Sequence, residues 1–207
     1  REGAAPQDRR AVTEREFSQL LTIFREGSRS NNCCAKYGVP AFVNFQCHLI
    51  ARVDDVSQFQ HVFIAPHNIY PDFAAKCRLA WSKNVREERD APWQIMLGSM
   101  DPVFCVFISL AIWLEYYLST NPGVSPYVFD FTQDGDIRIP KAGDKTNSFV
   151  SAKLHDLFGR SEFVADMDGP LGSHSIRKYG ATRVRNCGCS KDERDHRGRW
   201  KANRRVS

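Results

Sequence analysis

The stretch GSHSIRKYGATRVRNCGCSKDERDHRGRWK, residues 172–201, is the most informative part of this chain. His174 and Arg177 are three residues apart, so a helix over residues 174–185 places both side chains on one face, one turn apart. A glycine-centred turn follows, and Trp200 comes after it in an Arg-Gly-Arg-Trp segment. The stretch therefore predicts a helix that presents an imidazole and a guanidinium together, followed by a basic segment with an indole.

Positive charge is concentrated in the same region. Residues 174–207 hold 11 Lys or Arg against 3 Asp or Glu, which leaves 18 against 21 for residues 1–173. Clustered cations suit a polyanion such as DNA, although a solvated basic tail has the same composition. Charge alone does not separate these two interpretations.

Two helical patterns lie upstream. Thr13 and Glu16 form a capping box ahead of apolar residues at helical spacing, which predicts an amphipathic helix that ends at Gly27. Apolar residues recur at the same spacing over residues 39–55 (VPAFVNFQCHLIARVDD) and end in a charged cluster. We therefore expect a mostly buried helix with Arg52 at its end, where a buried charge needs partners.

A small sheet is predicted between these helical regions. Residues 60–64, 75–81 and 93–97 are short runs of strand-like composition. The polar segment SKNVREERDAP joins the last two runs, so they resemble a hairpin with Lys83 at its turn end.

Two more helices complete the prediction. A helix is predicted over residues 101–119, and residues 103–118 of it are strongly apolar. This apolar run is shorter than the roughly 20 residues that span a membrane, and it contains Glu115. We therefore expect a helix in the core of one compact domain. Residues 148–158 predict an amphipathic helix.

The order of these residues resembles the catalytic domain of tyrosine recombinases, which cut and rejoin DNA. His174-x-x-Arg177, a small-residue helix, a glycine turn and Arg-Gly-Arg-Trp look like the C-terminal signature of that family. The family also has an arginine with a carboxylate three residues on, which Arg52 and Asp55 match, and a lysine at a hairpin turn, which Lys83 matches.

The resemblance extends over residues 9–207. RRAVTEREFSQLL is similar to the Arg-x-Leu-Thr-x-x-Glu start of such domains, with Val12 in the place of the leucine. Within the family, the sequence is most similar to the eukaryotic Crypton transposon branch and its domesticated relatives. The segments that carry this similarity are LAWSKN, EERDAPWQIMLGSMDP and HSIRKYGAT. The resemblance implies an α+β, mainly helical catalytic-domain fold with a small antiparallel sheet over residues 11–207, after a flexible lead-in at residues 1–10.

It also implies a role for each matched residue in the chemistry of a phosphodiester. Arg52 and Arg177 would clamp the scissile phosphate, because a planar guanidinium meets two oxygens at once. His174 would stabilise the same phosphate or accept a proton, and Lys83 would protonate the departing 5′-oxygen. Trp200 would donate its indole N–H to a phosphate oxygen.

Further residues would support this site. Asp55 would orient Arg52 through its carboxylate without contacting the phosphate itself. No metal or other cofactor is expected, since Cys187-x-Cys189 lacks the ligand spacing of structural zinc sites. Contacts to the DNA are expected from the other basic residues of the C-terminal region, which are Lys178, Arg183, Arg197, Arg199, Lys201, Arg204 and Arg205.

The nucleophile of the family is a tyrosine shortly after the position of Trp200, and it forms a covalent bond to DNA. None of the six tyrosines of this chain fits that position. We therefore expect the span to be truncated before the nucleophile, and residues 1–207 alone not to cleave DNA.

The resemblance implies duplex DNA and further copies of the protein, in a synaptic tetramer, as partners. The seven cysteines are odd in number and several lie in apolar runs, which favours a reducing, intracellular setting, and the nucleus for a eukaryotic protein. Two other functions stay open: a domesticated DNA-binding protein without strand transfer, and a type IB topoisomerase with the same active-site chemistry. The presence of all the residues expected to clamp the phosphate and donate a proton argues against a protein that only binds DNA.

Overall fold

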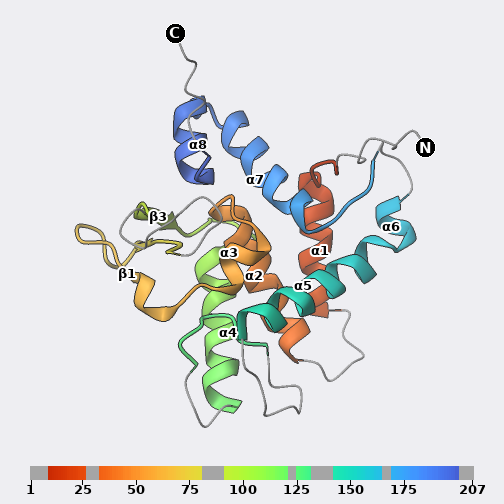
Figure 1. Ribbon diagram of the computed structural model, residues 1–207, viewed down its shortest axis with the longest axis horizontal. Coiled ribbons are helices and arrows are strands. Elements are labelled where there is room, and N and C mark those ends of the chain that lie inside the picture. Colours follow the sequence, from red (N-terminus) through yellow and green to blue (C-terminus); the bar gives the residue numbers. More distant parts are fainter. Residues whose placement is uncertain are drawn as a thin grey trace.

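The computed structural model describes residues 9–26, 33–80, 91–120, 125–131, 142–164 and 169–200. These residues form a mainly helical α+β fold with one three-stranded antiparallel sheet in the order β1-β2-β3 (Figure 1). The expected fold class is confirmed at this level. The helices are α1 (Glu14–Glu26), α2 (Val39–His48), α3 (Val53–Ser57), α4 (Val106–Thr120), α5 (Ala142–Phe158), α6 (Ser161–Val164), α7 (Ser173–Asn186) and α8 (Lys191–Gly198), and the strands are β1 (Ile64–Pro66), β2 (Ala74–Cys77) and β3 (Gln94–Leu97).

Helix α2 is the centre of the core. Every residue from Val39 to Cys47 is buried, and α2 packs against α1, α3, α4 and α7 (Figure 1). Its polar side chains have partners: Asn44 donates to Ser109 Oγ at 2.8 Å, and Gln46 donates to the carbonyl of Ser173 at 3.0 Å. A helix that is apolar on all sides is typical of a core position.

The capping box of α1 is confirmed. Glu16 N–H donates to Thr13 Oγ1 at 3.1 Å, and Thr13 N–H donates to the Glu16 carboxylate at 2.8 Å. Phe17, Leu20 and Leu21 are buried, so the apolar face of α1 covers the core.

The prediction of one helix over residues 39–55 is wrong. Helix α2 ends at His48, and Arg52 is the N-cap of a separate helix, α3. Ile50 turns the chain with a φ of 49°, which is costly for a β-branched side chain, and its complete burial holds it there. Hydrophobic spacing continues through this turn, so the pattern did not reveal it.

The sheet agrees with the prediction for its last two strands. Strands β2 and β3 pair antiparallel, with Ala75 opposite Met96 and Lys76 opposite Ile95. The first predicted strand is shifted: His61–Phe63 form a 3₁₀ turn and β1 follows it. The turn end of the β2–β3 hairpin, with Lys83, lies outside the described residues.

The remaining helices differ from the prediction mainly at their starts. Asp101 accepts the Val103 N–H at 2.8 Å and closes a turn, so α4 begins at Val106. Helix α5 starts at Ala142 and contains the predicted residues 148–158. No helix in the described ranges has the length and apolar character needed to cross a membrane.

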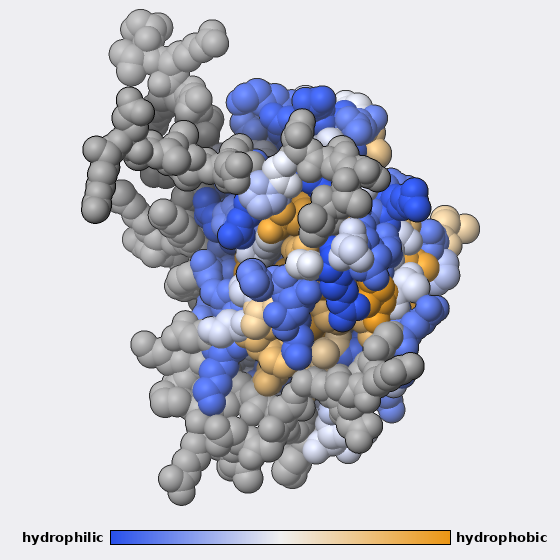
Figure 2. All heavy atoms as spheres, turned by 90° about the vertical axis from the view of Figure 1, so that its right-hand side faces the viewer, coloured by the Kyte–Doolittle hydropathy of each residue, from blue (hydrophilic) through white to orange (hydrophobic). Residues whose placement is uncertain are grey.

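Hydrophilic side chains cover much of the face that Figure 2 shows, and apolar ones are visible between them. Helix α5 has a buried apolar side and a more exposed side. Val150, Leu154 and Leu157 are buried, while the residues between them are largely exposed. The helix is therefore amphipathic, as its sequence predicts.

Helices α7 and α8 lie side by side at one end of the molecule (Figure 1). Gly180 lets α7 approach α2 closely, because an added Cβ there would overlap the carbonyl oxygen of Cys47. The glycine turn between the helices has Gly188 at a φ of 86°, a conformation that favours glycine.

Candidate phosphate-binding site

Four of the five predicted catalytic residues line one cavity of about 390 Å³: Arg52, His174, Arg177 and Trp200. Arg52 comes from the start of α3, His174 and Arg177 from the first turns of α7, and Trp200 from the segment after α8. Three distant segments of the chain therefore meet at one hollow. The other lining residues are Ala11, Lys178, Ala181 and Thr182.

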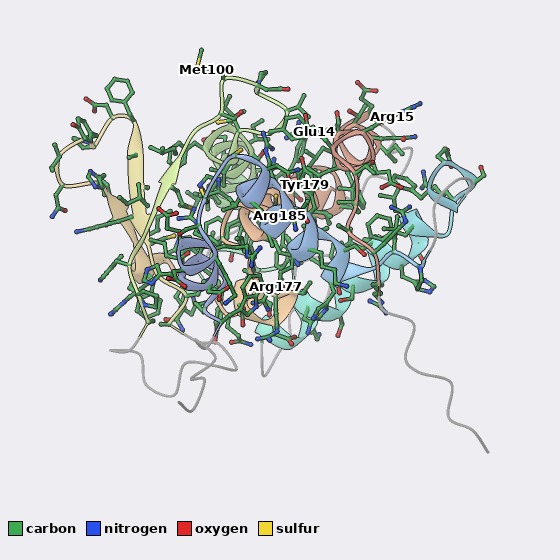
Figure 3. All side chains as sticks on the ribbon, turned by 90° about the horizontal axis from the view of Figure 1, so that it is seen from above. Glu14, Arg15, Met100, Arg177, Tyr179 and Arg185 are labelled. Atoms are coloured by element: carbon green, nitrogen blue, oxygen red, sulfur yellow. The ribbon has the colours of Figure 1, made fainter. Side chains whose placement is uncertain are left out.

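Arg177 is held by the end of α8. Its Nη2 donates to the carbonyl of Gly198 at 2.7 Å, and its guanidinium carbon lies 5.2 Å from the centre of the Trp200 ring. The residue is only 5% exposed, and its Nε is buried without a hydrogen-bond partner in the described part of the chain. Trp200 thus positions Arg177 through its ring face. Figure 3 shows Arg177 on α7, viewed from above.

Arg52 is fixed by its backbone. Its N–H donates to Asp55 Oδ2 at 3.1 Å, which caps α3. The Nη1 of its guanidinium is buried and has no hydrogen-bond partner among the residues described. Because Arg52 and Arg177 both line the cavity, their charges would stabilise an anion bound there.

Asp55 and Arg199 pair with each other beneath the cavity. Asp55 accepts a hydrogen bond from the backbone of Arg52, but its ion pair is with Arg199 at 3.2 Å. The two side chains are 1% and 4% exposed, and Arg199 also donates to the carbonyl of Leu49. Arg199 therefore stabilises the fold beneath the cavity, and its predicted contact with DNA stays a prediction. The sequence alone does not predict the burial of Arg199, because Arg197 and Arg199 lie on either side of Gly198 and have the same local sequence signals.

Arg197 and Arg183 were also expected to contact DNA, and both have other surroundings. Arg197 donates to the carbonyls of His48 at 3.0 Å and Ile95 at 2.7 Å, and so ties α8 to α2 and β3. Arg183 lies 5.4 Å from the Phe104 ring and lines a different cavity. Neither lines the hollow that contains Arg177.

Lys178 does line the cavity, and its ammonium donates to the carbonyl of Arg9 at 2.6 Å. Among the described basic residues that were expected to contact DNA, Lys178 is thus the one that lines the cavity. Lys83, Lys201, Arg204 and Arg205 lie outside the described residues, so their predicted roles stay predictions.

The cavity carries an excess of positive charge. Burial lowers the pKa of Arg177 to about 10, and the charge of Arg52 contributes in the same direction. Partial removal from water lowers the pKa of His174, and the charges of Arg177 and Arg52 lower it further. His174 is therefore mainly neutral near pH 7, able to donate one hydrogen bond and to accept a proton.

No tyrosine is among the described residues that line the cavity. Tyr117 and Tyr179 are buried in the core, and Tyr70 is exposed on the turn between β1 and β2. The expectation that none of the six tyrosines supplies the nucleophile stays a prediction.

Among the described residues, no group of three or more His, Cys, Asp or Glu is placed to hold a metal ion. The groups that the cavity offers are guanidiniums, an imidazole, an ammonium and an indole. These groups suit an anion rather than a metal cation.

Comparisons with protein-family models and with curated protein sequences find no match to this chain. The case for a function therefore rests on the geometry and charge of the cavity.

Proposed function

We propose that this chain is the catalytic domain of a tyrosine-recombinase-like enzyme, which cleaves and rejoins DNA through a 3′-phosphotyrosine intermediate. The observation that carries the proposal is the meeting of Arg52, His174 and Arg177, together with the Trp200 indole, in one cavity. Two such guanidiniums bind a phosphate in the way that phosphodiester chemistry requires.

The chemistry follows from the charge that develops on the phosphate. As a tyrosine oxygen attacks the phosphorus, negative charge grows on the non-bridging oxygens, and Arg52 and Arg177 stabilise it. His174 takes the proton of the tyrosine hydroxyl, since it is neutral near pH 7. The bond to the 5′-oxygen breaks, and that oxygen takes a proton from Lys83; attack by a 5′-hydroxyl reverses the steps and rejoins the strand.

Two parts of this scheme come from outside the described residues. The scheme assigns the attacking tyrosine to none of the described residues, and Lys83 lies in the segment between β2 and β3. Assembly as a tetramer on DNA, a nuclear location and a Crypton-type origin belong to the same proposal, and they rest on the sequence resemblance alone.

The decisive experiment uses the full-length protein and a nicked suicide duplex, which loses a short fragment after cleavage and traps the covalent product. We expect a protein–DNA adduct that survives denaturing electrophoresis and disappears in Arg177→Gln. Arg183→Gln is the matched control, because it removes the same charge from the same helix but lines the other cavity.

Other outcomes select the alternatives. Duplex binding without an adduct would show a DNA-binding protein that lacks strand transfer. Relaxation of a supercoiled plasmid without recombined products would indicate a type IB topoisomerase. Absence of any binding to duplex DNA would overturn all three functions.

A further inference from the structure

Arg9 lies at the edge of the candidate site, although no part of the family resemblance assigns it a role there. Its carbonyl accepts the hydrogen bond from Lys178, which lines the cavity, and Ala11, two residues further on, also lines it. The backbone of this segment is tied to α7 again where Val12 N–H donates to the carbonyl of Ser175 at 3.4 Å. The segment before α1 thus runs along the first turns of α7.

The guanidinium of Arg9 rests against Gly172, the N-cap of α7. A Cβ added at Gly172 would lie 2.7 Å from the Arg9 guanidinium carbon. The φ of Gly172 is −177°, which any residue adopts, so glycine is needed here for space and not for backbone freedom. A side chain at position 172 would therefore displace Arg9.

Arg9 adds a positive charge beside the cavity without entering it. The residue is exposed, and it is not among those that line the cavity. No described carboxylate forms an ion pair with it. Its charge reaches the site, since Arg9 contributes to the lowered pKa of His174 after burial, Arg177 and Arg52.

We propose that Arg9 binds a second phosphate of the same DNA strand, next to the phosphate held by Arg52 and Arg177. Its place at the rim explains why it would meet a neighbouring phosphate and not the one in the cavity. This inference rests on the proposed function, because a second phosphate has meaning only if the cavity holds the first.

The test compares two small ligands, so it needs no knowledge of the DNA target. Thymidine 5′-monophosphate offers one phosphate, and deoxythymidine 3′,5′-bisphosphate offers two. We expect residues 1–207 to bind the bisphosphate about tenfold more tightly, as one charge-assisted hydrogen bond would give. Isothermal titration at low salt measures both affinities.

Two variants should remove this difference by separate routes. Arg9→Gln takes away the charge, whereas Gly172→Ala keeps the charge and displaces the guanidinium. Arg15→Gln is the matched control: it removes one exposed charge from α1, away from Arg177 as Figure 3 shows, and should keep the tenfold preference. Thermal melting of each variant establishes that it is folded.

The results separate this inference from the proposed function. If the preference persists in Arg9→Gln while Arg177→Gln weakens both ligands, the second phosphate site is wrong and the cavity assignment stands. If the wild-type chain binds neither ligand, the cavity assignment itself is wrong. Loss of the preference in both Arg9→Gln and Gly172→Ala, with Arg15→Gln unchanged, would establish the site.

Discussion

Helix α7 separates two cavities that differ in size and in the state of their cations. The larger one, about 500 Å³, is lined by Phe17, Phe104 and Val184, and its arginines are engaged: Arg197 donates to two carbonyls. Arg183 lies against the Phe104 ring.

The smaller cavity, about 390 Å³, contains Arg52 and Arg177, each with a buried donor that lacks a partner among the described residues. A site for an anion is thus marked by unsatisfied charge and not by volume. Substitutions on both sides of α7 and changes of pH test that contrast.

The largest effect is expected at Asp55, the buried carboxylate that offsets the positive charge beneath the smaller cavity. Asp55→Asn leaves Arg199 buried without its ion pair, close to Arg52 and Arg177. Removing one partner of a buried pair costs about 3–5 kcal/mol of the free energy of unfolding. Urea denaturation measures the free energy of unfolding of this variant, and Asp54→Asn, at an exposed neighbouring position, is the control. A loss below about 1 kcal/mol in Asp55→Asn would contradict the importance of the ion pair.

The contrast between the two sides of α7 predicts unequal effects on DNA binding. In residues 1–207, Arg177→Gln should weaken binding to a short duplex by about 1.5–3 kcal/mol, or at least tenfold, through loss of a charged hydrogen bond. Arg183→Gln removes the same charge from the other side and should cost less than half as much. Fluorescence anisotropy at fixed salt measures both, and equal losses would refute the distinction between the cavities.

The close contact between α7 and α2 keeps both cavities in place. Gly180→Ala puts a methyl group against the Cys47 carbonyl and should lower the free energy of unfolding by about 1–3 kcal/mol. Gly159→Ala is the control, since its added Cβ would have only ordinary contacts of 3.5 Å or more. Thermal and urea denaturation compare the two, and similar stabilities would mean that the helices can separate without cost.

The smallest effect is a pH dependence of anion binding. The pKa of His174 is lowered because burial and the charges of Arg177, Arg52 and Arg9 disfavour its protonated form, and a bound phosphate would offset that repulsion and raise the pKa. Phosphate affinity should therefore increase as the pH falls from 8 toward 6 and His174 takes up a proton. NMR titration of the imidazole with and without phosphate measures the change, and His174→Gln should abolish it.

The same lowered pKa affects stability with a definite sign. The unfolded chain binds a proton at His174 at a higher pH than the folded chain does, so this residue favours the folded state fully above about 6.5. That contribution is lost as the pH falls below 6.5 toward the folded pKa. Bound phosphate should reduce the loss.

Local signals in the sequence predicted several elements well. The capping box of Thr13 and Glu16 set the start of α1, and the apolar spacing after it set its buried face. Helix α7 was predicted to within a residue at each end, because its glycine turn ends it locally. The break at Ile50 was missed, because burial and not local preference holds that residue at a positive φ.

The sequence by itself determined which chemical groups are present and that His174 and Arg177 share a helical face, since covalent spacing and helix geometry decide this. Only the tertiary structure decided that Arg52 and Trp200 join them, and that Arg199 is the partner of Asp55. The physical reason is that contacts between distant segments depend on how α2, α3, α7 and α8 pack. Arg197 and Arg199 flank the same glycine, so the sequence does not distinguish them. Packing buries Arg199 against the Asp55 carboxylate, whereas the half-buried Arg197 donates to backbone carbonyls.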